Sequence, residues 1–227
     1  MKIEGMKNSM TANYKAVIFD MDGTLLNSIE DLTDSINFIL DKHKLPTRTI
    51  TEVMHMVGSG AAKLVERAIP LGRDNPKFQE ILDDYKAYYF DHCNIKTGPY
   101  TNIIELLKEL KTRGYKMAIV SNKSMNAIQE LKNQYFNDYI DVAVGVTENV
   151  KRKPAPDECY LAIEEMGVNK EDCIYVGDSD VDHLTAANTG LPCISCLWGF
   201  RTKEELLAAG AENNYFVEDP LEILDIV

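Results

Sequence analysis

The chain has 227 residues, of which 45% are hydrophobic and 26% are charged, and its 36 acidic and 24 basic residues give a formal net charge of −12. This composition is typical of a globular protein and excludes a disordered or fibrous chain. The excess of acid argues against a nucleic-acid-binding protein, which usually carries a basic face. No apolar run approaches the about 20 residues that a membrane span needs, so we expect no membrane partner.

The segment 1–13 is polar and lacks the apolar stretch of a secretory signal, so we expect a disordered leader there. The five cysteines are scattered and odd in number, which is typical of reduced thiols and indicates a cytoplasmic location. Cys193 and Cys196 lie in an apolar run without a second Cys or His pair at zinc spacing. We therefore interpret this pair as part of a buried strand.

The first predicted element is a buried strand at 15–20, and a long helical segment follows it. Between 26 and 98 there is little strand signal and much helical pattern. The first helix is opened by Ser28-x-x-Asp31, which resembles a capping box, and the later helices are predicted at 51–57, 61–68 and 76–92. We expect a helical domain at 26–98, inserted into a core formed by 14–25 and 99–227.

From residue 99 onward, helical patterns alternate with short apolar runs. Helices are predicted at 101–113, 124–135, 156–166 and 180–189. Strands are predicted at 116–121, 172–178, 192–197 and 214–217. Continuous apolar runs suit parallel strands that are covered on both faces. The alternation therefore predicts an α/β fold whose core is a Rossmann-like, doubly wound parallel sheet.

Three of the predicted strands end on polar residues, which are Asp20, Ser121 and Asp178. In an open parallel sheet, ligands bind beyond the carboxyl ends of the strands. We therefore expect these three side chains to lie at one edge of the sheet. Asp178 and Asp182, together with Asp20, form a set of carboxylates that could hold a hard cation.

Two further groups accompany these acids. Ser121 and Asn122 precede a predicted helix, and a hydroxyl with exposed amides at a helix N-terminus suits an anion such as phosphate. The run Lys151-Arg-Lys-Pro-Ala-Pro-Asp157 contains two prolines that would fix Lys153 in space. Neither acidic loop fits a calcium-binding EF-hand. In the first, Thr24 and Leu25 occupy the positions of the third acid and the glycine, and in the second, His183 and Thr189 occupy those of the glycine and the glutamate.

The order of these motifs resembles the haloacid dehalogenase superfamily. The motifs are, in chain order, Asp20-x-Asp22-Gly-Thr24, Ser121, Lys153-Pro154 and Gly177-Asp-Ser-x-x-Asp182. The helical insert, with Val57-Gly-Ser-Gly60 followed by Leu64-Val-Glu-Arg-Ala68, is similar to the cap domain of the phosphoglycolate phosphatase-like branch.

The resemblance implies a role for each motif. Asp20 would be the nucleophile that forms an aspartyl-phosphate, and Asp22 would be the general acid and base. Mg²⁺ would be held by Asp20, the backbone carbonyl of Asp22, and Asp178. Ser121, the Asn122 amide and Lys153 would hold the transferring phosphoryl group. Thr24 would brace the Asp22 loop, and Asp182 would orient a metal-bound water or Lys153.

In the cap, Gly58, Ser59, Gly60 and Lys63 are candidates for contacts with the substrate, although Gly58 and Gly60 equally suit a turn between two helices. Phosphomutases of the superfamily carry an arginine and a histidine where this chain has Ala61 and Leu32, which favours water as the acceptor.

The resemblance thus implies a Mg²⁺-dependent phosphatase of a small phosphorylated metabolite, with phosphoglycolate as the first candidate substrate. The presence of Asp22 favours phosphoryl transfer over dehalogenation. An inorganic pyrophosphatase, a phosphomutase and a non-catalytic phosphate-binding protein remain alternatives. We expect a monomer or a homodimer.

Overall fold

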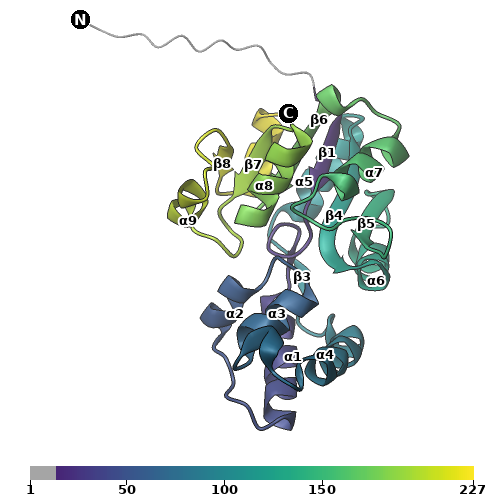
Figure 1. Cartoon of the computed structure of the whole chain (residues 1–227). Helices are drawn as coiled ribbons and strands as arrows, with labels where there is room; N and C mark the ends of the chain where they lie inside the picture. Colours follow the sequence, from purple (N-terminus) through teal and green to yellow (C-terminus); the bar gives the residue numbers. More distant parts are fainter. Residues whose placement is uncertain (1–13) are drawn as a thin grey trace, which may run out of the picture.

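The computed structural model describes residues 14–227, so the predicted leader at 1–13 lies outside the described residues. These residues form an α/β core and a helical part that extends from one edge of its sheet (Figure 1). Among them, no helix combines the length and the apolar character that crossing a bilayer requires.

The core contains a six-stranded parallel sheet with the order β5-β4-β1-β6-β7-β8. The predicted fold class is therefore confirmed. The first strand of the chain lies in the centre, which brings the motif at its carboxyl end between those of its neighbours. The strands are β1 (Ala16–Phe19), β4 (Lys116–Ser124), β5 (Val142–Val146), β6 (Cys173–Gly177), β7 (Cys193–Cys196) and β8 (Tyr215–Val217).

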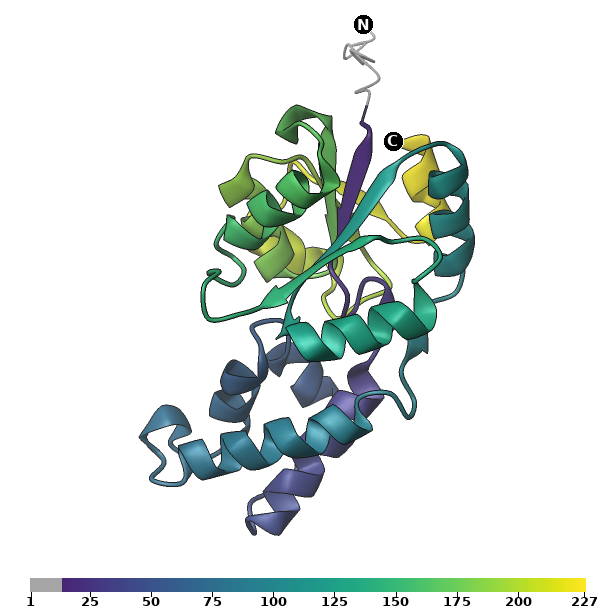
Figure 2. The ribbon, with the colours of Figure 1, turned by 90° about the vertical axis from the view of Figure 1, so that its right-hand side faces the viewer.

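Helices cover both faces of the sheet (Figure 2). Val17 and Phe19 of β1 pack in the cluster with α5 (Ile103–Thr112) and α6 (Met125–Tyr135). Ala16 and Ile18, which alternate with them, pack in the cluster with the helices of the opposite face. Burial on both faces explains why the strand is continuously apolar. The helices of the second face are α7 (Asp157–Met166) and α8 (Asp180–Thr189).

Strand β5 and helix α9 (Lys203–Ala208) are not predicted by the sequence pattern. β5 is an edge strand and contains Gly145, a residue that weakens a local strand signal. A Cβ atom at Gly145 would lie 2.5 Å from Cδ1 of Ile128 on α6. It would also lie 2.9 Å from the backbone carbonyl oxygen of Lys123 on β4, so the close approach of β4 and α6 favours glycine here, and contacts over such sequence separation are not visible in the local pattern.

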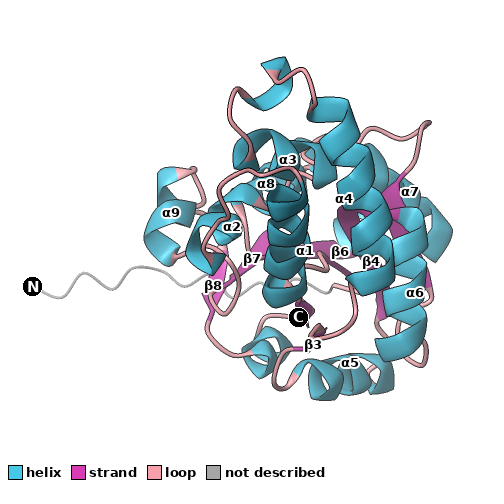
Figure 3. Ribbon diagram, turned by 90° about the horizontal axis from the view of Figure 1, so that it is seen from below, coloured by secondary structure: helices cyan, strands magenta, loops and turns pink. Residues whose placement is uncertain are grey.

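The helical part has an apolar core of its own. Its helices are α1 (Ile29–Lys42), α2 (Ile50–Met56), α3 (Ala61–Ala68) and α4 (Phe78–His92). The chain enters and leaves it through β2 (Leu26–Asn27) and β3 (Gly98–Pro99), which pair antiparallel. Seen from the helical end, α1 and α4 lie in front of the sheet (Figure 3). We propose this pair of strands as the boundary of the cap domain, at 26–98.

The predicted capping box at Ser28 and Asp31 is wrong. Ser28 makes no side-chain capping bond, and its hydroxyl donates to Oδ1 of Asp22 at 2.6 Å. The buried carboxylate of Asp31 accepts the backbone N–H groups of Ile95, Lys96 and Thr97 at 2.8–3.0 Å. Asp31 therefore anchors the segment that leaves the cap to the helix that enters it.

Replacing Asp31 with Ala should lower the free energy of unfolding by about 2–4 kcal/mol, because several buried N–H donors lose a charged acceptor. Urea unfolding followed by circular dichroism measures this loss. Asp34→Ala is the matched control on the same helix, because the Asp34 side chain is 59% exposed and, among residues 14–227, pairs with the Lys96 ammonium alone, so its loss should stay within about 0.5 kcal/mol. Equal losses in the two variants would contradict the anchoring role.

Candidate functional site

The carboxyl ends of the central strands face the cap and bring the predicted acids together (Figure 1). Asp20 directly follows β1, Asp178 directly follows β6, and Asp182 lies in the first turn of α8. One carboxylate oxygen from each of these three lies within 4.8 Å of the others, and all three side chains are buried. The site therefore concentrates negative charge where the parallel sheet ends.

Lys153 supplies the cation at the centre of this group. Its Nζ donates to Oδ1 of Asp20 at 2.7 Å, to Oδ1 of Asp182 at 2.8 Å, and to the Tyr175 hydroxyl at 3.0 Å. The residue is only 4% exposed. Burial alone would lower the pKa of Lys153, but the charges of Asp182 and Asp20 outweigh that effect and raise it. The ammonium group is thus held charged between two carboxylates.

Both carboxylate oxygens of Asp182 accept hydrogen bonds from the protein. Oδ1 accepts from Lys153 and from Tyr175, while Oδ2 accepts from the N–H and the hydroxyl of Ser179 in a capping box at the start of α8. Burial opposes the charged form, but the Lys153 ammonium outweighs it and holds the pKa of Asp182 below its usual range. Asp182 is therefore placed to hold the Lys153 ammonium in a fixed orientation.

The side chain of Asp178 is closely approached by two glycines, Gly23 and Gly199. A Cβ atom at Gly23 or at Gly199 would come within 2.3 Å of Asp178 atoms, so only glycine permits this approach. The hydroxyl of Thr24, the residue expected to brace the Asp22 loop, donates to Oδ1 of Asp178 at 3.1 Å. Burial, followed by the charges of Asp182 and Asp20, raises the pKa of Asp178 well above its usual range. Burial likewise raises the pKa of Asp20 to about 7, against the opposing charge of Lys153.

These residues fit a divalent cation. Within 14–227, no cationic side chain contacts Asp178, although its carboxylate is fully buried. Uncompensated buried carboxylates are costly, and a nearby cation would stabilise their charged forms. An all-oxygen ligand set is the one that Mg²⁺ prefers. Asp178 accepts one neutral donor on each oxygen, from Thr24 and from the N–H of Phe200, whereas Asp182 accepts two donors on each and is paired with Lys153, so Asp20 and Asp178 suit the ion better than Asp182.

Asp22 contacts a lysine that the sequence pattern did not single out. Lys123 Nζ lies 3.1 Å from Oδ1 of Asp22 and also donates to the Tyr89 hydroxyl of the cap helix α4. Ser28 donates to the same Asp22 oxygen. Oδ2 of Asp22 has no hydrogen-bond donor among residues 14–227. The sequence feature that could have identified Lys123 as a site residue is its position two residues after Ser121, at the predicted end of the strand.

Ser121 and Asn122 precede α6, which begins at Met125 as the predicted helix at 124–135 requires, but the predicted strand end at 121 is wrong, because β4 continues through both residues to Ser124. The ladder to β5 is irregular between Val120 and Ser124, which bends the strand end. Ser121 is buried and lines the cavity between core and cap. The side-chain Nδ2 of Asn122 donates to the carbonyl oxygen of Gly58 in the cap at 2.9 Å and to that of Lys153 at 3.1 Å.

Of the four cap residues predicted to contact the substrate, two line the cavity and two do not. Gly58 and Gly60 line the same cavity as Asp20 and Asp22, whereas Ser59 and Lys63 are not among its lining residues. Gly60 has a φ of +82°, and a Cβ there would lie 3.1 Å from the Asn122 carbonyl oxygen. Lys63 Nζ is 2.6 Å from Oε1 of Glu66 on its own helix. The two glycines form the turn between α2 and α3 and allow the cap to approach the core, and their contact with a substrate stays a prediction.

Comparisons with known proteins agree with this geometry. Residues 17–196 match the family model of the haloacid dehalogenase-like hydrolases. A phosphoglycolate phosphatase from Rhodospirillum rubrum is 33% identical, over 87% of this chain and 85% of that protein. An N-acetylmuramic acid 6-phosphate phosphatase from Pseudomonas aeruginosa is 27% identical, over 94% of each chain. The crystal structure of a predicted phosphoglycolate phosphatase from Haemophilus somnus is 26% identical, with a TM-score of 0.85 over 94% of this chain and 98% of that one. The chain therefore belongs to the haloacid dehalogenase-like hydrolase family.

Proposed function

We propose that this chain is a Mg²⁺-dependent phosphatase that hydrolyses a small organic phosphate monoester through an aspartyl-phosphate on Asp20. The observation that carries the proposal is the convergence of Asp20, Asp22 and Ser121 on one cavity, with Lys153 bonded to Asp20. The names of the relatives support phosphatase activity and make phosphoglycolate the first compound to test.

In the first step, Asp20 attacks phosphorus and the bond between phosphorus and the alcohol oxygen breaks. One oxygen of Asp20 accepts from Lys153, which fixes the carboxylate, and the other has no hydrogen-bond donor among residues 14–227. Asp22 gives a proton to the departing oxygen. Its Oδ1 is anchored by Ser28 and Lys123, so Oδ2 is the oxygen that would exchange the proton.

In the second step, water attacks the aspartyl-phosphate, Asp22 takes a proton from that water, and inorganic phosphate leaves with Asp20 restored. Ser121, the Asn122 amide and Lys153 would hold the phosphoryl oxygens during both steps. Mg²⁺, held by Asp20, the backbone carbonyl of Asp22 and Asp178, would reduce the repulsion between the carboxylate and the phosphate.

The proposed setting is the cytoplasm, with a small phosphorylated metabolite as the partner. All five cysteines are free and buried, which supports a reducing compartment. The net charge of −12 supports the absence of a nucleic-acid partner.

Asp20→Asn should lower phosphate release by about 10³-fold or more, because the amide is a poor nucleophile. The measurement is steady-state phosphate release from phosphoglycolate and p-nitrophenyl phosphate. Asp180→Asn is the matched control, since Asp180 is an aspartate of the same region whose side chain is 46% exposed and pairs with Arg201. Near-normal turnover by Asp20→Asn would exclude the covalent mechanism.

Removal of divalent cations with EDTA should reduce phosphate release to background, and added Mg²⁺ should restore it. Calorimetric titration gives a readout that is independent of turnover. The wild type should bind Mg²⁺, and Asp178→Asn should bind it at least about tenfold more weakly, because one charged oxygen ligand is lost. Unchanged Mg²⁺ affinity in Asp178→Asn would remove Asp178 from the ligand set.

Lys123→Met tests the proposed anchoring of Asp22. Its kcat should fall by about 10–100-fold for phosphoglycolate, whose alkoxide leaving group needs the proton from Asp22. The loss should be smaller for p-nitrophenyl phosphate, because nitrophenolate leaves readily without protonation. Lys63→Met, a lysine bonded to Glu66 outside the cavity, should leave both rates unchanged. Equal losses for the two esters in Lys123→Met would point to a purely structural role.

A further inference from the structure

The cavity that contains Asp20 and Asp22 continues from the core into the cap. Its volume is about 400 Å³, within the range of about 300–1,000 Å³ that is typical of small-molecule sites. Only its floor is needed for the phosphoryl group, which Ser121 and Lys153 would hold. The rest of the volume is available to the alcohol part of the ester. The chemistry of the residues that line this volume therefore indicates which kind of alcohol fits the site.

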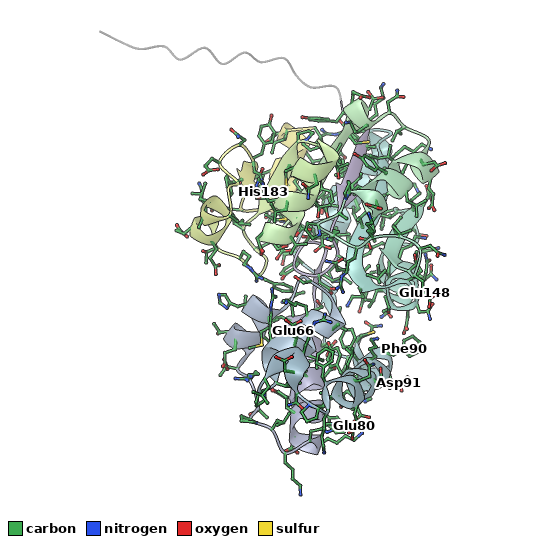
Figure 4. The ribbon with its side chains drawn as sticks, in the orientation of Figure 1. Glu66, Glu80, Phe90, Asp91, Glu148 and His183 are labelled. Carbon is green, nitrogen blue, oxygen red and sulfur yellow. The ribbon has the colours of Figure 1, made fainter. Side chains whose placement is uncertain are left out.

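The cap side of the cavity is apolar. Helix α4 contributes three aromatic rings, and Figure 4 shows Phe90 on the side of α4 that faces the core. Apolar side chains of α1, α3 and the end of α2 complete this wall, and Ala127 and Val146 add to it from the core. The apolar side chains from the cap are Leu32, Val57, Ala61, Ala62 and Leu64, and the aromatic ones are Tyr85, Tyr89 and Phe90.

Few groups on this wall can bond to hydroxyl groups. Among the lining residues of the cap, only Tyr85, Tyr89 and Lys86 carry polar side-chain atoms, and the Tyr89 hydroxyl already accepts from Lys123. A polyhydroxylated alcohol would lose its water there without gaining equivalent partners, which is unfavourable. An apolar or aromatic group would instead gain contact with the wall.

The charged lining residues favour an anion that enters from solvent. Besides Asp20 and Asp22, the lining residues include no acid, whereas Lys86, Lys123 and Arg152 are basic. Lys86 and Arg152 are exposed, so the basic groups of the entrance are open to solvent. A locally positive entrance in a chain of net charge −12 attracts an anionic substrate.

We propose that the site prefers phosphate monoesters whose alcohol part carries an apolar or aromatic group, over esters of two-carbon acids and of polyhydroxylated sugars. This inference rests on the proposed phosphatase function and defines its substrate class. The phosphoryl group lies against the carboxyl edge of the sheet, and the apolar group packs against Leu64, Tyr85 and Phe90 of the cap.

The test compares kcat/KM for 2-phenylethyl phosphate, ethyl phosphate, phosphoglycolate and glucose 6-phosphate with the full-length wild-type chain and Mg²⁺. All four release an alkyl alcohol, so differences report mainly on how the alcohol part is bound. The phenylethyl ester should exceed ethyl phosphate by at least about tenfold and should also exceed the other two. A higher value for phosphoglycolate or glucose 6-phosphate overturns the inference alone, whereas no release from any ester overturns the phosphatase function itself.

A matched pair of variants locates the effect. Phe90 is 48% exposed and lines the cavity, whereas Phe38 is 50% exposed and stacks on Tyr88 outside it. Phe90→Ala should lower the ratio of kcat/KM for the phenylethyl ester to that for ethyl phosphate by at least about threefold. Phe38→Ala should keep the wild-type ratio. An unchanged ratio in Phe90→Ala, or the same fall in both variants, would contradict the assignment of this wall.

Discussion

The buried ammonium of Lys153 is the interaction on which the site depends. A fully buried lysine is tolerated only when its charge is paired and its hydrogen bonds are satisfied, and here Asp20, Asp182 and Tyr175 provide both. These partners come from the end of β1 and from the consecutive elements β6 and α8, so one ammonium group joins the beginning of the core to a segment far along the chain. The same contacts fix the orientation of Asp20, so the requirement for charge pairing also organises the chemistry that we propose.

A second constraint is the attachment of the cap to this edge of the sheet. Asn122 bonds to the Gly58 carbonyl, Arg201 bonds to the Val57 carbonyl, and Lys123 bonds to Tyr89. Each contact connects a core loop or strand end with a cap element beside the cavity. The cap therefore contributes directly to the environment of Asp22 and supplies most of the wall that an alcohol group would meet. In the function that we propose, the core carries the chemistry and the cap the selectivity, and these few polar contacts connect the two.

The local sequence was sufficient to predict the architecture and the core of the site. Continuous apolar runs predicted β1, β4, β6, β7 and β8, because strands of a sheet that is covered on both faces are mostly apolar along their length. Polar residues at three strand ends predicted that Asp20, Ser121 and Asp178 would share one edge, because parallel strands end on the same side. The order of the motifs then led to the family, and the match over residues 17–196 confirms it.

Other features were decided only by the tertiary structure, because they depend on partners far away in the chain. Ser28 and Asp31 fit a local capping pattern, yet Ser28 bonds to Asp22 and Asp31 bonds to residues 95–97. β4 extends past Ser121 because β5 pairs with it up to Ser124, and this extension brings Lys123 to Asp22. The sequence by itself therefore determined which residues we propose as the reactive groups. The folded chain determined which oxygen of each carboxylate is held and which side chains surround the substrate, since those follow from packing between distant segments.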